Sequence, residues 1–130
     1  MIDDLSGKAS KNEEFQQSLY KDYMDYLKPY GKKNGLNTIE KVQNAISRDL
    51  SNMREHSAVS DILDGLSKGN IHGVAGHDLE YWAKNADAVY SEAFAHMFEA
   101  QFDEVRYNQM KTYFPNALKK FEDIIEVISK

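Results

Sequence analysis

The segment Ser91–Phe98, which reads Ser-Glu-Ala-Phe-Ala-His-Met-Phe, combines metal-binding residue types with a helical spacing. On a helix, Glu92, His96 and Glu99 gather on one side and form a polar stripe. Residues four apart lie one turn above each other, so Glu92 and His96 could share a cation. Small residues border this polar stripe and would let another backbone or a ligand come close; they are Ala88, Ala93, Ala95 and Ala100. The opposite side of the helix collects the apolar residues Tyr90, Phe94, Met97, Phe98 and Phe102. The alternative is that the polar stripe faces solvent on an amphipathic helix.

Two further histidines, His72 and His77, lie in the glycine-rich segment 68–77, which we expect to form a loop or at most a short hairpin. A pair of loop histidines facing the Glu-x-x-x-His helix would supply the nitrogen and oxygen ligands that zinc or nickel bind. This hypothesis predicts a metal site made of His72, His77, Glu92 and His96. The alternative is that the loop histidines are surface residues or cap nearby carbonyls.

Aromatic and acidic residues flank the same glycine-rich segment. Tyr81 and Trp82 follow it, and we expect this pair to anchor the loop onto the core, with a substrate platform as the alternative. Asp61 and Asp64 precede it on a predicted helix. We interpret Asp64 as part of a solvated helix face and Asp61 as a partly buried cap for the loop.

The composition limits the classes of function. The chain has 130 residues, enough for one domain, residues 1–130, with a real core. Its net charge is −5, which argues against nucleic acid or an anionic membrane as the main partner, because phosphate binding needs a basic surface. The absence of cysteine excludes disulfides and thiolate chemistry. No stretch approaches the about 20 apolar residues of a membrane span.

Apolar residues at helical spacing predict a series of helices separated by short loops. The first helix begins at Asn12 and ends at Pro29, because proline interrupts a helix interior. The second begins at Asn37, which matches a capping box with Glu40 three residues later. The clearest amphipathic stripe of the chain follows and consists of Ile39, Val42, Ile46, Leu50 and Met53.

The second half of the chain continues this helical pattern. Ser57 is expected to cap a third helix, and residues 78–84 add one or two turns. The next helix either breaks near Asp103 or continues to Tyr113. Pro115 suits the first position of the last helix, whose predicted buried face is Leu118, Phe121, Ile124, Ile125 and Ile128. Together these patterns predict an all-α fold of five or six helices around one core.

The sequence around Glu92 resembles a known family. Glu-Ala-Phe-Ala-His-Met-Phe is similar to the downstream helix of gluzincin metallopeptidases of the lethal-factor type, where the pattern is roughly Glu-Phe-Phe-Ala-Glu-Ala-Phe. In that family the first glutamate is the third zinc ligand, so the resemblance implies that Glu92 binds zinc. His96 stands where the family has no ligand. The first residues, Met1-Ile2-Asp3-Asp4-Leu5-Ser6-Gly7, resemble the segment that directly follows the catalytic His-Glu-x-x-His helix of the family.

Three further segments resemble proteins encoded by phages and prophages, including minor head or structural proteins. They are residues 60–65, 76–82 and 113–115, and the resemblance covers most of residues 57–125. It implies a protein of the cytoplasm of a bacterial host or of the virion.

The sequence departs from the peptidase family because it contains no His-Glu-x-x-His motif. The resemblance therefore implies an inactive C-terminal half of a zincin-like domain, which begins just after the place where that motif would end. Its partner would be its own missing N-terminal segment, and Glu92 would complete the zinc site. Tyr81, Tyr90 or His77 could then stabilise an oxyanion. The alternative is a non-enzymatic helical structural protein of a phage particle, with a self-complementary apolar patch and a stable oligomer.

Overall fold

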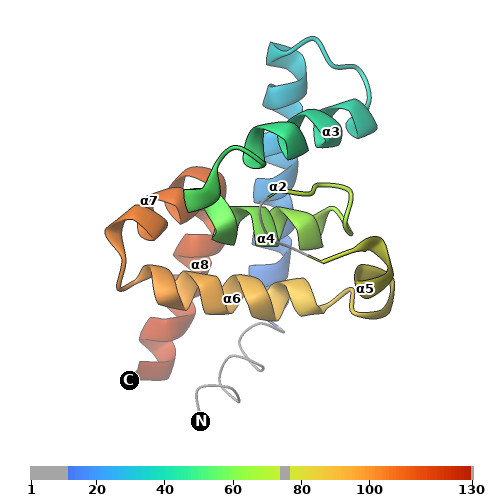
Figure 1. Cartoon of the computed structure of the whole chain (residues 1–130). Coiled ribbons are helices and arrows are strands. Elements are labelled where there is room, and N and C mark those ends of the chain that lie inside the picture. The colour runs from blue at the N-terminus through green and yellow to red at the C-terminus, as the bar shows by residue number, and fades with distance from the viewer. Residues whose placement is uncertain (1–11, 74–76, 130) are drawn as a thin grey trace.

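The architecture is seen in a computed structural model, which describes residues 12–73 and 77–129, with side chains to residue 127. Within these ranges the chain forms helices, turns and coil without a strand, which confirms the all-α prediction (Figure 1). The described α-helices are α2 (Glu13–Lys33), α3 (Ile39–Leu50), α4 (Ser57–Leu66), α5 (Leu79–Lys84), α6 (Ala88–Ala100), α7 (Glu104–Tyr113) and α8 (Pro115–Ser129), and a 3-10 turn, η1, covers Arg54–His56. The described α-helices are more numerous than the five or six predicted. The helical structure is interrupted between α6 and α7, and α5 forms a separate helix.

The helix starts follow side-chain capping, with two corrections to the predicted positions. Thr38, not Asn37, is the N-cap of α3, and its hydroxyl accepts the backbone N–H of Lys41 at 3.2 Å. Asn37 instead accepts the side-chain amine of the same lysine. Ser57 is the first residue of α4 rather than its cap, because η1 runs directly into the helix.

The prediction that the first helix ends at Pro29 is wrong, because Pro29 lies inside α2. The loss of one backbone N–H is tolerated here, and the stop comes four residues later. There the backbone N–H of Asn34 bonds to Tyr30, that of Leu36 bonds to Gly31, and Gly35 adopts φ +66°. A left-handed glycine after the last turn is the usual way to end a helix.

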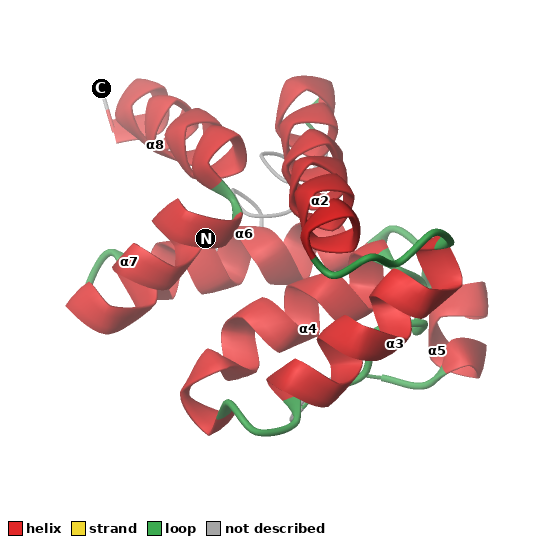
Figure 2. Cartoon of the chain, turned by 90° about the horizontal axis from the view of Figure 1, so that it is seen from above, coloured by secondary structure: helices red, strands yellow, loops and turns green. Residues whose placement is uncertain are grey.

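The hydrophobic core lies between two helix pairs. Along α2 runs α8, and α4 packs against α6; Figures 1 and 2 show both pairs from perpendicular directions. Phe94 of α6 joins them, with its ring 5.7 Å from that of Phe15 on α2 and 4.7 Å from that of Phe121 on α8. Trp82 of α5 is fully buried, which confirms its predicted role as an anchor.

The last helix begins at Pro115, as predicted, and is capped from a distance. Asp22 of α2 is buried and accepts the backbone N–H of Ala117 at 2.8 Å and the side-chain amide of Asn116 at 2.7 Å. Of the predicted buried face, Leu118 and Phe121 are buried, Ile124 and Ile125 are partly buried, and the side chain of Ile128 lies outside the described residues. No helix of the described chain is both long and apolar enough to cross a membrane.

Two features of α6 differ from the expectation of an amphipathic helix facing solvent. Glu92 and His96 are half-buried and contact residues of α4 and the segment before α5, so the solvent-facing interpretation is wrong for these two residues. Glu99, the third residue of the polar stripe, is exposed as that interpretation expects. Phe102, assigned to the apolar side, is 79% exposed because α6 ends at Ala100.

A glycine sets the distance between α4 and α6. A Cβ atom on Gly65 would lie 2.6 Å from the Cβ of Val89 and 2.8 Å from the ring of Trp82, so only glycine fits at this crossing. Asp61 lies one turn before Gly65 on α4, and Glu92 lies three residues after Val89 on α6. The close approach of the two helices therefore brings the polar side chains of both within reach of each other.

Candidate metal centre

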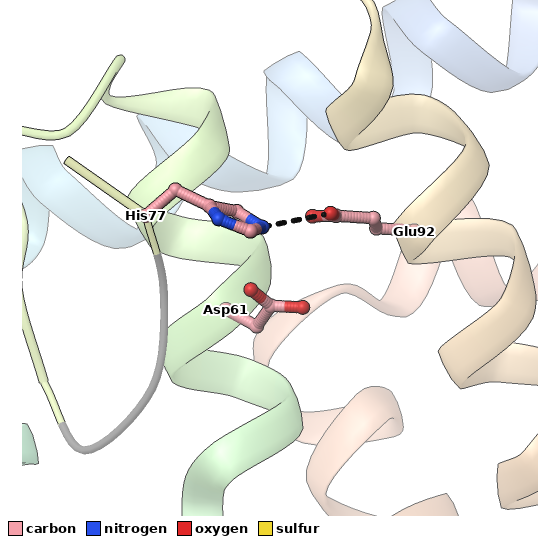
Figure 3. Close-up of side chains that lie close together, drawn as sticks. All are labelled: Asp61, His77 and Glu92. Carbon is pink, nitrogen blue, oxygen red and sulfur yellow. Dashed lines mark hydrogen bonds and ion pairs between the residues drawn. The ribbon is translucent and has the colours of Figure 1, made fainter. Parts of the chain in front are cut away.

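Three side chains from separate elements converge beside the α4–α6 crossing. Asp61 comes from α4, His77 from the residue before the N-cap of α5, and Glu92 from α6. One ligand atom from each lies within 4.8 Å of the others. The Nε2 of His77 is 3.2 Å from Oε1 of Glu92, and Figure 3 shows the three groups turned toward a common space.

A fourth polar side chain joins this cluster through Asp61. His96 lies one turn beyond Glu92 on α6, and its Nε2 donates to Oδ2 of Asp61 at 2.8 Å. Asp61 thus links the two histidines that the sequence had placed near Glu92. A histidine in this position holds a carboxylate in one orientation, as the outer partners of metal ligands do.

The position of His77 is fixed by a buried carboxylate. Asp64 is completely buried, and its Oδ2 accepts the backbone N–H of His77 at 2.5 Å. The prediction that Asp64 belongs to a solvated face is therefore wrong. The ring of Tyr81 stacks on that of His77, with 3.7 Å between centroids and 20° between planes. Trp82 contacts the same imidazole edge-on at 5.4 Å.

The electrostatics of the cluster favour a bound cation. Burial raises the pKa of Glu92, and the nearby charge of Asp61 raises it further, while the bond from His77 acts in the opposite direction. Oε2 of Glu92 is buried and has no hydrogen-bond partner among the described residues. Two half-buried carboxylates that face each other repel, and a divalent cation between them would remove that repulsion.

The donor set fits a metal that binds nitrogen and oxygen. Two carboxylates and one imidazole suit zinc or another first-row divalent ion. Ligand atoms at about 2.1 Å from a tetrahedral zinc are about 3.4 Å apart. The present spread of up to 4.8 Å must therefore contract by up to about 1.4 Å, which side-chain rotation can supply. The hydrogen between His77 and Glu92 would leave as the metal enters, since ligands must be deprotonated.

Two predicted site residues lie outside the cluster. The side chain of His72 is 55% exposed, and its Nδ1 is 3.8 Å from Oδ2 of Asp64. Tyr90 lines a shallow hollow between α2 and α6 together with Tyr20. Of the three predicted catalytic candidates, His77 belongs to the cluster and Tyr81 lies beside it, because the Tyr81 ring stacks on the imidazole of His77.

The role of Asp61 was not predicted from the sequence. It had been assigned as a loop cap, and its side chain instead takes part in both the cluster and the bond to His96. A signal was present, since Asp61 belongs to the segment 60–65 that carries part of the phage-protein resemblance.

Comparison of the chain with family models gives no match, and comparison with curated proteins and with solved structures gives none either.

Proposed function

We propose that this chain is a metal-binding helical domain in which Asp61, His77 and Glu92 hold a divalent ion, zinc in the first instance. The observation that supports it most is the convergence of three ligand atoms within 4.8 Å from three different elements. His96 orients Asp61, and Asp64 fixes the backbone of His77. The bond from His96 gives Asp61 the kind of outer support that metal ligands normally have.

The proposal agrees with the resemblance to gluzincin metallopeptidases in one central point. Glu92, the residue that the resemblance assigns to zinc, is the α6 member of the cluster. A zinc ion there would act as a Lewis acid toward a carbonyl or lower the pKa of a bound water. We infer a phage-encoded, virion-associated or host-cytoplasmic protein related to the C-terminal half of such a domain and inactive by itself, since His-Glu-x-x-His is absent from the sequence.

Metal binding is tested on protein purified without an affinity tag. Ligand binding stabilises the folded state by RT ln(1 + [L]/Kd), which is about 2.7 kcal/mol at one hundred times Kd. We expect zinc at that concentration to raise the melting temperature by roughly 10 °C over protein in a chelator, at about 4 °C per kcal/mol. Protein that contains no metal after purification and is not stabilised by added zinc would rule out the proposal.

The relation to the peptidase family is tested separately, at the level of DNA. We expect the reading frame upstream of Met1 to encode His-Glu-x-x-His ending within a few residues of Ile2. A stop codon or unrelated sequence there would refute the family relation and leave the metal site to be judged on its own measurements.

A further inference from the structure

An apolar hollow lies between the end of α2 and the start of α3, away from the metal cluster. Its volume is about 220 Å³, and its apolar lining consists of Met24, Leu27, Leu36, Ile39 and Val42. Ile39 is 56% exposed although it begins a well-packed helix. Pockets for small molecules usually measure about 300–1,000 Å³, so this hollow is the size for one large side chain rather than for a cofactor.

The rim of this hollow is basic. Lys28 and Lys32 line it, and neither forms an ion pair with a described residue. Residues 28–41 contain four lysines and one glutamate, a balance of +3 in a chain whose net charge is −5. An occupant of the hollow should therefore be an apolar side chain with acidic neighbours.

The chain itself carries such a group at the turn between α6 and α7. Phe102 is 79% exposed and Val105 is 61% exposed, which makes Phe102 the most exposed large apolar residue among those described. Residues 99–105 contain three acidic residues and no basic one. Arg106, just beyond, pairs with Glu99 at 3.0 Å and with Asp103 at 3.7 Å, and Glu104 forms no ion pair with a described residue. We call residues 99–105 the acidic turn and the hollow with its two lysines the basic groove.

The two surfaces lie at different ends of the molecule. In Figures 1 and 2 the α6–α7 turn is on one side of the structure and the α2–α3 corner is well away from it. A chain therefore cannot place its own acidic turn in its own basic groove, and the two surfaces can meet only between copies.

We propose that the chain associates head to tail, with Phe102 of one copy in the basic groove of the next and the acidic turn beside Lys28 and Lys32. This inference does not depend on metal binding. An interface that joins two different patches propagates, so it forms chains or closed rings rather than only symmetric dimers. The lysine–carboxylate contacts are exposed, so added salt should weaken the association.

Sedimentation velocity over a range of protein concentrations tests the proposal. We expect the wild type to show growing species larger than a dimer, which diminish in high salt. Phe102→Ser should weaken association at least about tenfold, as truncation of a central aromatic anchor does. Val127→Ser is the matched control, because Val127 is 74% exposed on α8 and belongs to neither surface, and it should leave association unchanged.

A mixing experiment distinguishes head-to-tail contact from a symmetric interface. Phe102→Ser keeps an intact groove, and the double variant K28E/K32E keeps an intact acidic turn. Each alone should be monomeric, and their mixture should form a 1:1 dimer that grows no further. A wild type that is monomeric at all concentrations overturns the proposal. A loss of association in Val127→Ser equal to that in Phe102→Ser overturns it as well. Association of the wild type without a heterodimer in the mixture would show a symmetric interface and also overturn it. Far-ultraviolet circular dichroism confirms that each variant is folded.

Discussion

Replacing Gly65 with alanine tests whether the α4–α6 crossing positions the metal cluster. The new Cβ would lie 2.6 Å from the Cβ of Val89, 2.8 Å from the ring of Trp82, and closer still to a methyl group of Val89. Carbon atoms in contact normally stand about 3.5–4.0 Å apart, so the helices must separate by about 1 Å. The Cβ of Val89 is fixed to its backbone and cannot rotate away.

The size of the effect follows from two opposing terms. Alanine is a better helix former than glycine by about 1 kcal/mol, which alone would stabilise α4. Overpacking a core costs about 1–3 kcal/mol, and a clash with a backbone-bound atom belongs at the upper end. We expect Gly65→Ala to lose about 2 kcal/mol of unfolding free energy, or roughly 8 °C in melting temperature. The same separation moves Asp61 from Glu92, so zinc affinity should fall about tenfold, as when the support of a metal ligand is lost.

Urea unfolding followed by circular dichroism measures the first quantity, and zinc titration of the folded variant measures the second. Val89→Gly removes both the methyl group and the Cβ that a Cβ on Gly65 would meet, so the cost of Gly65→Ala should be smaller by at least about 1 kcal/mol in that background. A Gly65→Ala protein that is more stable than the wild type, or a fully additive double variant, would refute the role of this crossing. Unchanged zinc affinity in a destabilised variant would refute its link to the site.

Three further predictions concern buried carboxylates. Asp64→Ala should lose about 1–3 kcal/mol because it leaves the backbone N–H of His77 unpaired, whereas Asp64→Asn keeps an acceptor and should unfold at or above the wild-type midpoint; thermal unfolding at pH 7 compares them. Asp22→Ala should lower the free energy of unfolding by about 1–3 kcal/mol, because it removes the cap of α8. A loss smaller than about 0.5 kcal/mol in urea unfolding would contradict this capping role. Burial raises the pKa of Glu92, so the stability that its protonated form contributes is complete below the unfolded pKa of about 4.3 and is lost as pH rises through the folded pKa. Without metal, the stability of Glu92→Gln relative to the wild type should therefore grow from pH 4 to pH 7. If the free energies of unfolding of the two chelator-treated proteins change with pH in parallel, the prediction is wrong.

The helical architecture was predictable because its signals are local. Amphipathic spacing located α3, and the proline at position 115 located the start of α8, since both depend on residues within one or two turns. Pro29 misled the prediction because the end of α2 is set by Gly35 and the contacts of Gly31, which the local rule for proline does not include.

The candidate site was predictable only in part. The four-residue spacing of Glu92 and His96 placed both on one side of α6, and His77 was named with them. Asp61 was not, because its pairing with His96 spans 35 positions and depends on how α4 packs on α6. For the same reason the burial of Asp64 was missed, since a carboxylate on a helix boundary is ordinarily solvated and here a distant loop covers it.

The most direct test of the metal centre is calorimetric titration of zinc into tag-free wild type, Glu92→Gln and His72→Gln proteins. His72→Gln is the matched control, because that histidine lies in the same loop region and outside the cluster. We expect one zinc per chain in the wild type, equal affinity in His72→Gln, and loss of binding in Glu92→Gln. Absence of binding in the wild type, or the same affinity in Glu92→Gln as in the wild type, would contradict the assignment of Asp61, His77 and Glu92 as a metal site.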